Sequence, residues 1–107
     1  MADVGPLSPQ QKAEYEQEYR QSAALFQKAL AQYQQAGNPY QQAEFQGVMK
    51  QAMHILKETA RSLMRKELQK CNEQIAHDYA TFQQHPTDKD TLNKLNHDLD
   101  KAKNLPK

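Results

Sequence analysis

Several residue types that build large or secreted domains are rare in this chain. It has no Trp, one Cys and three Gly, and Leu, Ile, Val and Phe together make up only 17 of its 107 residues. A single Cys cannot form an internal disulfide, which is typical of proteins in a reducing compartment. So few strong apolar residues predict a thin core, and a thin core is often completed by a partner or by a second copy of the chain.

Long apolar runs and an excess of charge of one sign are also missing. No stretch approaches the roughly 20 apolar residues that cross a bilayer, so we expect no membrane insertion. The first residues lack the basic and apolar regions of an ordinary signal peptide. This favours a cytoplasmic protein, with export by a signal-less route as the alternative. The 14 basic and 13 acidic residues nearly balance, which disfavours a dedicated nucleic-acid binder.

The residues that are present carry clear signals for helix ends. The segment Ser8-Pro9-Gln10-Gln11 has the order of an N-cap, a first helical Pro and a capping-box Gln. Nothing breaks a helix from there to about residue 36, where Gly37 offers a left-handed C-terminal cap. Asn38-Pro39 then repeats the start signal. Stop and start signals in direct succession predict a tight turn between two antiparallel helices.

The remaining helix start and stop signals predict a second and a third helix. The second runs over about 39–84 and ends before Pro86, which disfavours helix at the preceding residue. A register shift of its apolar stripe near 60–64 leaves open whether this helix is continuous or broken. The third runs over about 88–104. The expected fold is all-α, a long antiparallel hairpin of 9–36 and 39–84 plus a short third helix, with residues 1–7 as a flexible lead and 8–107 as one domain.

Basic residues recur at helical spacing along the second helix. As a partner site they would attract an acidic protein or a nucleic-acid backbone. As a solvated flank they would instead pair with Glu14, Glu16 and Glu18 of the first helix, which the hairpin register brings near. The register favours the flank, and the candidate residues are Lys50, Lys57, Arg61, Arg65 and Lys66.

Apolar residues of the second and third helices form a candidate helix interface. They follow the spacing of helices that pack in bundles or coiled coils. The set comprises Leu68, Cys71, Ile75, Tyr79, Phe82, Leu92, Leu95 and Leu99. For Cys71 its place on this stripe favours a buried structural thiol, with an intermolecular disulfide or thiol chemistry as alternatives.

The sequence offers no set of residues to which catalytic roles can be assigned. The four His residues are not spaced as metal ligands on one helix face, and no Gly-rich phosphate loop, nucleophile triad or cofactor motif appears. We therefore expect a non-enzymatic protein–protein interaction module, such as an adaptor, a chaperone-like protein or an assembly subunit. It would present an amphipathic helix face to another helical protein or to itself.

Overall fold

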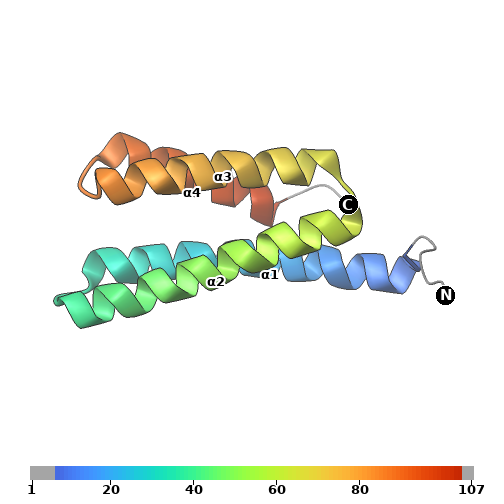
Figure 1. Cartoon of the computed structure of the whole chain (residues 1–107), viewed down its shortest axis with the longest axis horizontal. Helices are drawn as coiled ribbons and strands as arrows, with labels where there is room; N and C mark the ends of the chain where they lie inside the picture. Colours follow the sequence, from blue (N-terminus) through green and yellow to red (C-terminus); the bar gives the residue numbers. More distant parts are fainter. Residues whose placement is uncertain (1–6, 105–107) are drawn as a thin grey trace.

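The computed structural model describes residues 7–104, and this part of the chain is all-α, as expected (Figure 1). Successive helices run in opposite directions along the long axis of the molecule. They are α1 (Pro9–Gln35), α2 (Pro39–Leu63), α3 (Lys66–Gln84) and α4 (Lys89–Lys103). Residues 1–6 of the expected lead lie outside the described part, and Leu7 is half-buried against the core.

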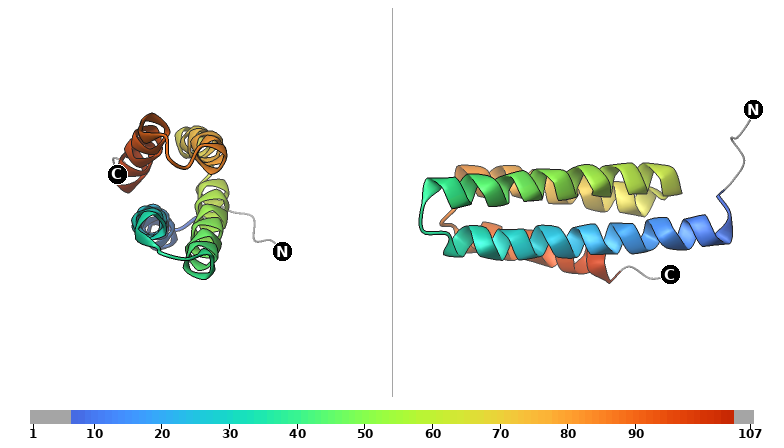
Figure 2. Two further views of the ribbon diagram at one scale, coloured as in Figure 1. Left: turned by 90° about the vertical axis from the view of Figure 1, so that its left-hand side faces the viewer. Right: turned by 90° about the horizontal axis from the view of Figure 1, so that it is seen from below.

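The helices stand at the corners of a rough square when viewed along the bundle (Figure 2). Neighbours around the square are α1 and α2, α2 and α3, α3 and α4, and α4 and α1. The molecule measures 50 × 25 × 19 Å. This is an antiparallel four-helix bundle, in which each helix buries one stripe and leaves the opposite face to solvent.

The expected start signals of the first two helices are confirmed. At the start of α1, the Gln11 backbone N–H donates to Ser8 Oγ (3.1 Å) and the Ser8 backbone N–H donates to Gln11 Oε1 (3.0 Å), which is a complete capping box. At the start of α2, the Gln41 backbone N–H donates to Asn38 Oδ1 (2.9 Å). The left-handed cap expected at Gly37 is wrong, because α1 ends through an extended Ala36 and Gly37 has no positive φ.

The helical stretch expected over 39–84, whose continuity the register shift left open, is broken, so the bundle has one helix more than expected. The stretch divides into α2 and α3 at Met64, the only non-glycine residue of 7–104 with a positive φ (54°). The chain reverses there, so that α3 returns alongside α2 (Figure 1). A straight helix would have carried the apolar stripe of α3 beyond the end of α1. Reversal buries that stripe instead, which offsets the strain of a side chain in the left-handed region.

The core runs through the middle of the bundle and links all the helices. Tyr19 of α1 is fully buried, and its hydroxyl donates to Asn72 Oδ1 of α3 (2.8 Å). Asn72 Nδ2 in turn donates to the Leu56 carbonyl of α2 (2.9 Å). Phe26 of α1 meets Tyr79 of α3 edge to face, with ring centroids 5.2 Å apart. The contacts between α1 and α3 cross the square and the one between α3 and α2 runs along one side, so each hairpin is held by the other as well as by itself.

The last helix packs on two neighbours rather than one. It lies against α3 and also along α1 (Figure 2). Gln27 Nε2 of α1 donates to Asp100 Oδ1 of α4 (2.9 Å), and this bond marks the edge of their contact. The short third helix of the expected fold therefore closes the bundle as α4.

Candidate functional site

The outward side of α2 is an uninterrupted exposed helix face. Residues three, four and seven positions from Gly47 share its side of the helix, and buried Leu56 lies on the opposite side. Every member of this set is exposed. We call it the Gly47 face, and it consists of Tyr40, Ala43, Glu44, Gly47, Lys50, Gln51 and His54.

Two residues of the Gly47 face contribute little to the fold. Tyr40 is 90% exposed, which makes it the most exposed of the large hydrophobic residues of 7–104. A Cβ added at Gly47 would meet no atom within 4 Å, so no close approach inside the bundle requires a glycine there. A glycine in a helix interior costs about 1 kcal/mol relative to Ala. The packing within the described bundle therefore explains neither residue.

The candidate basic stripe is only partly free. Arg65 is withdrawn from it, because its guanidinium donates to Glu16 (3.1 Å) and to Glu67 (2.8 Å). The hydrogen bond to Glu67 is the main cause that raises the pKa of Arg65. Arg61 lies 3.8 Å from Glu58, at the limit of an ion pair. Within residues 7–104 no acidic group lies within ion-pair distance of Lys50, Lys57 or Lys66, which are all exposed.

Of the acidic residues of α1 expected to neutralise this stripe, only Glu16 does so. Neither Glu14 nor Glu18 forms an ion pair with a described residue. The side chains of Lys57 and Arg61 instead line an open groove of about 270 Å³ between α2 and α3, together with Gln69 and Glu73. The groove is lined by two cations and one carboxylate, so it is weakly basic.

Most of the candidate helix-interface residues are used inside the bundle. Six of them are buried in the core, namely Leu68, Ile75, Tyr79, Phe82, Leu95 and Leu99. The other two, Cys71 and Leu92, are half-buried and pack against it. In this fold the stripe joins α3 and α4 to the rest of the chain, so it offers little surface to another protein.

The environment of Cys71 suits a structural thiol. Its Sγ lies 3.9 Å from the Asp98 carbonyl of α4, and burial raises the pKa of the thiol above its usual value. A raised pKa leaves less thiolate at neutral pH, and the thiolate is the nucleophile. These observations favour the packing role over thiol chemistry.

A buried pair of acids between α3 and α4 was not anticipated from the sequence. Asp78 and Asp98 are 6% and 7% exposed. Burial, and then the neighbouring Asp78 carboxyl, raise the pKa of Asp98 to about 7. Both Asp78 oxygens accept from Gln74 Nε2 (3.3 Å), whereas Asp98 Oδ2 is buried and no N–H or O–H group of 7–104 reaches it. A proton held between the two carboxyls would satisfy Asp98. The available signal was that each Asp stands on the apolar stripe of its helix, where a charged residue is exceptional.

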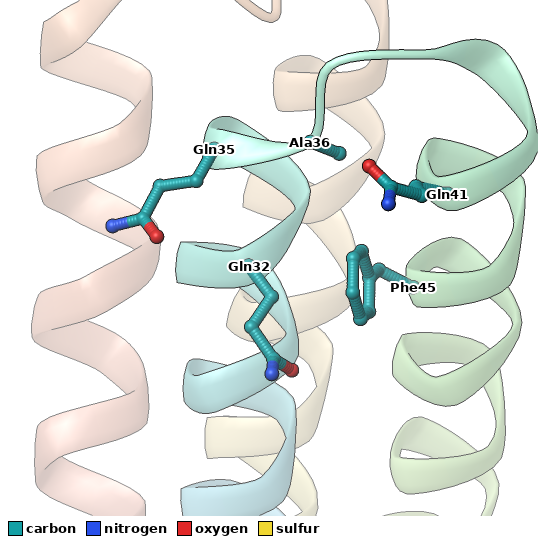
Figure 3. A pocket seen from close by; sticks show the side chains of 5 residues that line it. All are labelled: Gln32, Gln35, Ala36, Gln41 and Phe45. Carbon is teal, nitrogen blue, oxygen red and sulfur yellow. The ribbon is translucent and has the colours of Figure 1, made fainter.

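The turn end of the first hairpin carries a shallow, uncharged pocket (Figure 3). The Phe45 ring points into the space between α1 and α2, below Ala36 of the turn, while the Gln35 side chain points away from it. Three glutamines line the pocket, namely Gln32, Gln35 and Gln41. Their amides can exchange hydrogen bonds with any polar partner, so the pocket does not favour one ligand chemistry.

Residues 7–104 contain neither a group of metal-ligating side chains nor a membrane-spanning helix. No three His, Cys, Asp or Glu side chains are grouped as metal ligands would be. Within the same residues, no helix has both the length and the apolar content that crossing a bilayer requires. Comparison of the whole chain with protein-family models, with curated proteins and with solved structures gives no match.

Proposed function

We propose that this chain is a non-enzymatic protein–protein interaction module that binds its partner through the Gly47 face of α2. The observation that carries the proposal is the combination of a 90% exposed Tyr40 with a glycine that the bundle itself does not need. Tyr is enriched at protein interfaces because it has a large apolar ring and a polar tip. A glycine on the same face lets another backbone approach closely.

The rest of the bundle supports this assignment by its construction. The apolar stripe of α2 is buried against α1 and α3, which holds this helix firmly in the bundle. Interaction sites on rigid helices are better preorganised than sites on loops, since less conformational freedom is lost on binding. An adaptor or assembly subunit requires only such a supported face.

Photo-crosslinking tests the proposal directly. Tyr40→p-benzoylphenylalanine, expressed at the natural level of the chain, is expected to give a specific crosslinked protein species on irradiation. The matched control is Gln83→p-benzoylphenylalanine, because Gln83 is also exposed but lies on α3. Crosslinks from position 40 and none from position 83 support the proposal. Equal crosslinking from both positions, or none from position 40, contradicts it.

A second candidate function rests on the exposed cations along α2. The basic stripe would bind an acidic partner through Lys57 and Arg61, which face the groove between α2 and α3. The double variant Lys57→Glu, Arg61→Glu is then expected to abolish salt-sensitive binding to a polyanion such as heparin. Arg65 is a poor choice for this test, since its loss would also break the contact with Glu16. Binding that survives the double variant would exclude the stripe.

A further inference from the structure

The joint between the two hairpins is the strained point of the backbone. Met64 has φ 54° and ψ 35°, a left-handed conformation that no other non-glycine residue of 7–104 shares in the sign of its φ. In this conformation Cβ lies too close to a carbonyl oxygen, so a residue with a side chain adopts it only where the rest of the fold requires it. The Met64 side chain does not require it, because it is 83% exposed. Contacts elsewhere in the bundle therefore impose the reversal.

The residues around the joint favour a continuous helix instead. The segment 62–67 reads Ser-Leu-Met-Arg-Lys-Glu, which has neither Gly nor Pro and consists mostly of strong helix formers. Arg65 at the start of α3 forms no side-chain cap hydrogen bond. The other helices of 7–104 do have a capping side chain, namely Ser8, Asn38 and Asp88. A helix that ran through Met64 would pair the first N–H groups of α3 with the last carbonyls of α2.

The contacts that hold the hairpins together do not require both hairpins to come from one chain. The Tyr19 hydroxyl of α1 donates to Asn72 Oδ1 of α3 (2.8 Å), and the Phe26 and Tyr79 rings of the same helices meet at 5.2 Å. These residues are about 50 positions apart, and the chain links the two hairpins only through Met64. The α3–α4 hairpin of a second copy can therefore make the same contacts.

The order of the helices gives such an exchange a closed geometry. In the bundle α2 and α3 lie side by side and run in opposite directions (Figure 1). If 39–84 is one straight helix in each of two copies, α2 of either copy lies beside α3 of the other. The bundle is then rebuilt twice about a two-fold axis between the joints. Each rebuilt bundle takes α1 and α2 from one copy and α3 and α4 from the other.

We propose that this chain forms a domain-swapped dimer in which Met64 becomes helical and the two copies exchange their α3–α4 hairpins. The closed bundle and the dimer share the same core contacts, so the joint decides between them. Straightening relieves two left-handed residues, whereas association costs translational freedom, so the dimer is favoured at high protein concentration. Short hinges under strain are where such exchange occurs.

The dimer would give the chain a second property without using the Gly47 face. In both forms α2 keeps the same neighbours, so this face stays on the outside and the dimer carries two copies of it. Two linked binding faces raise the avidity for a repeated partner without any new contact. The inference does not rest on the proposed function, because only the joint and the core contacts carry it.

Glycine at the joint tests the proposal against a matched control. Refolding from urea at about 1 mM allows the hairpins to choose their partner, and sedimentation velocity then measures the dimer. Met64→Gly accepts the left-handed conformation and weakens a continuous helix, so the dissociation constant should rise by about tenfold for each of two joints, about a hundredfold in total. Ser62→Gly is the control. Residue 62 is exposed and helical in both forms, so this change should leave the dissociation constant unchanged.

A distance within one chain distinguishes the swapped dimer from two closed bundles in contact. Nitroxide labels are placed at Ala43→Cys and Gln83→Cys in a Cys71→Ser background, since both positions are exposed. Labelled chain is diluted into unlabelled chain and measured by double electron–electron resonance. In the closed bundle both labels lie toward the end that carries the two turns, so their distance is much shorter than its 50 Å length (Figure 1). In a straight helix, 40 residues separate them by about 60 Å.

The outcomes are decisive in either direction. A dimer with the long distance, which Met64→Gly weakens and Ser62→Gly does not, supports the exchange. A wild type that refolds only to monomer at about 1 mM overturns it. A dimer that keeps the short distance, or that Met64→Gly forms as tightly as the wild type, overturns it as well.

Discussion

The two helical hairpins of the bundle bury different kinds of residue. Between α1 and α2 the core is apolar and rich in alanine, with Ala23, Ala29, Ala52 and Ala60 all buried. The buried polar residues of this hairpin are the small Ser22 and Thr59, and the Thr59 hydroxyl donates to the Ile55 carbonyl of its own helix (2.8 Å). Between α3 and α4 the core includes the two acids Asp78 and Asp98. The first hairpin is thus held by packing, whereas the second also buries a pair of carboxyl groups.

This difference has an energetic cause. Alanines let two helices approach closely, and the resulting contact does not change with pH. Two neighbouring buried carboxyls are stable only while one of them is protonated. If both were ionised, the two negative charges would repel each other and neither would be hydrated by water. We therefore expect the contact between α3 and α4 to respond to pH.

The largest expected effect is on the contact between the hairpins. Phe26→Ala removes a fully buried ring that packs edge to face on Tyr79, and large-to-small core changes of this kind cost about 3–5 kcal/mol. We expect a loss of this size in the free energy of unfolding, measured by urea denaturation. Leu25→Ala, at the neighbouring and 42% exposed position, should cost far less. Equal losses would mean that the hairpins do not support each other.

The second prediction concerns the acid pair and has a defined sign. The pKa of Asp98 rises on folding from an ordinary value near 4 to about 7, so between these pH values the folded chain binds more protons than the unfolded chain. This contribution to stability is fully present below pH 4 and is lost as the pH rises through 7. From pH 5 to pH 8 the free energy of unfolding should fall by roughly 1–3 kcal/mol.

Asp98→Asn should flatten this dependence and make the protein more stable than the wild type at pH 8. The amide keeps the shape of the carboxyl and has no charge to oppose Asp78. Asp100→Asn is the control, because the hydrogen bond from Gln27 lowers the pKa of the exposed Asp100 carboxyl, so its loss should not stabilise the protein at pH 8. Thermal unfolding at pH 5 and pH 8 measures both. An Asp98→Asn protein with the pH profile of the wild type would show that the pair does not set it.

The smallest expected effect is at the joint between the hairpins. Met64 is 83% exposed and adopts the left-handed conformation that glycine tolerates best. Met64→Gly should therefore stabilise the bundle by about 0.5–1 kcal/mol, read from the urea midpoint. Ser62→Gly, inside α2 and also exposed, should destabilise it by a similar amount. A Met64→Gly protein less stable than the wild type would mean that the exposed Met side chain contributes a contact.

Much of the first hairpin could be predicted from the sequence, and less of the second. The start of α1 at Ser8 and of α2 at Asn38 depends on hydrogen bonds within three residues, so residue order is enough to indicate them. The break at Met64 has no Gly or Pro to mark it, and only the register shift of the apolar stripe pointed to it. The Gly47 face was overlooked because an exposed glycine and tyrosine become informative only when the buried side of the helix is known.

By itself, the sequence determined that the chain is helical, where most of its helices begin and end, and that their stripes are apolar. Capping, proline geometry and helical spacing act over a few neighbouring residues. The tertiary structure alone decided that α3 folds back at Met64, that α4 packs on α1, and that Asp78 meets Asp98. These contacts join residues far apart in the chain, and the need to bury as much apolar surface as possible in one core selects among them.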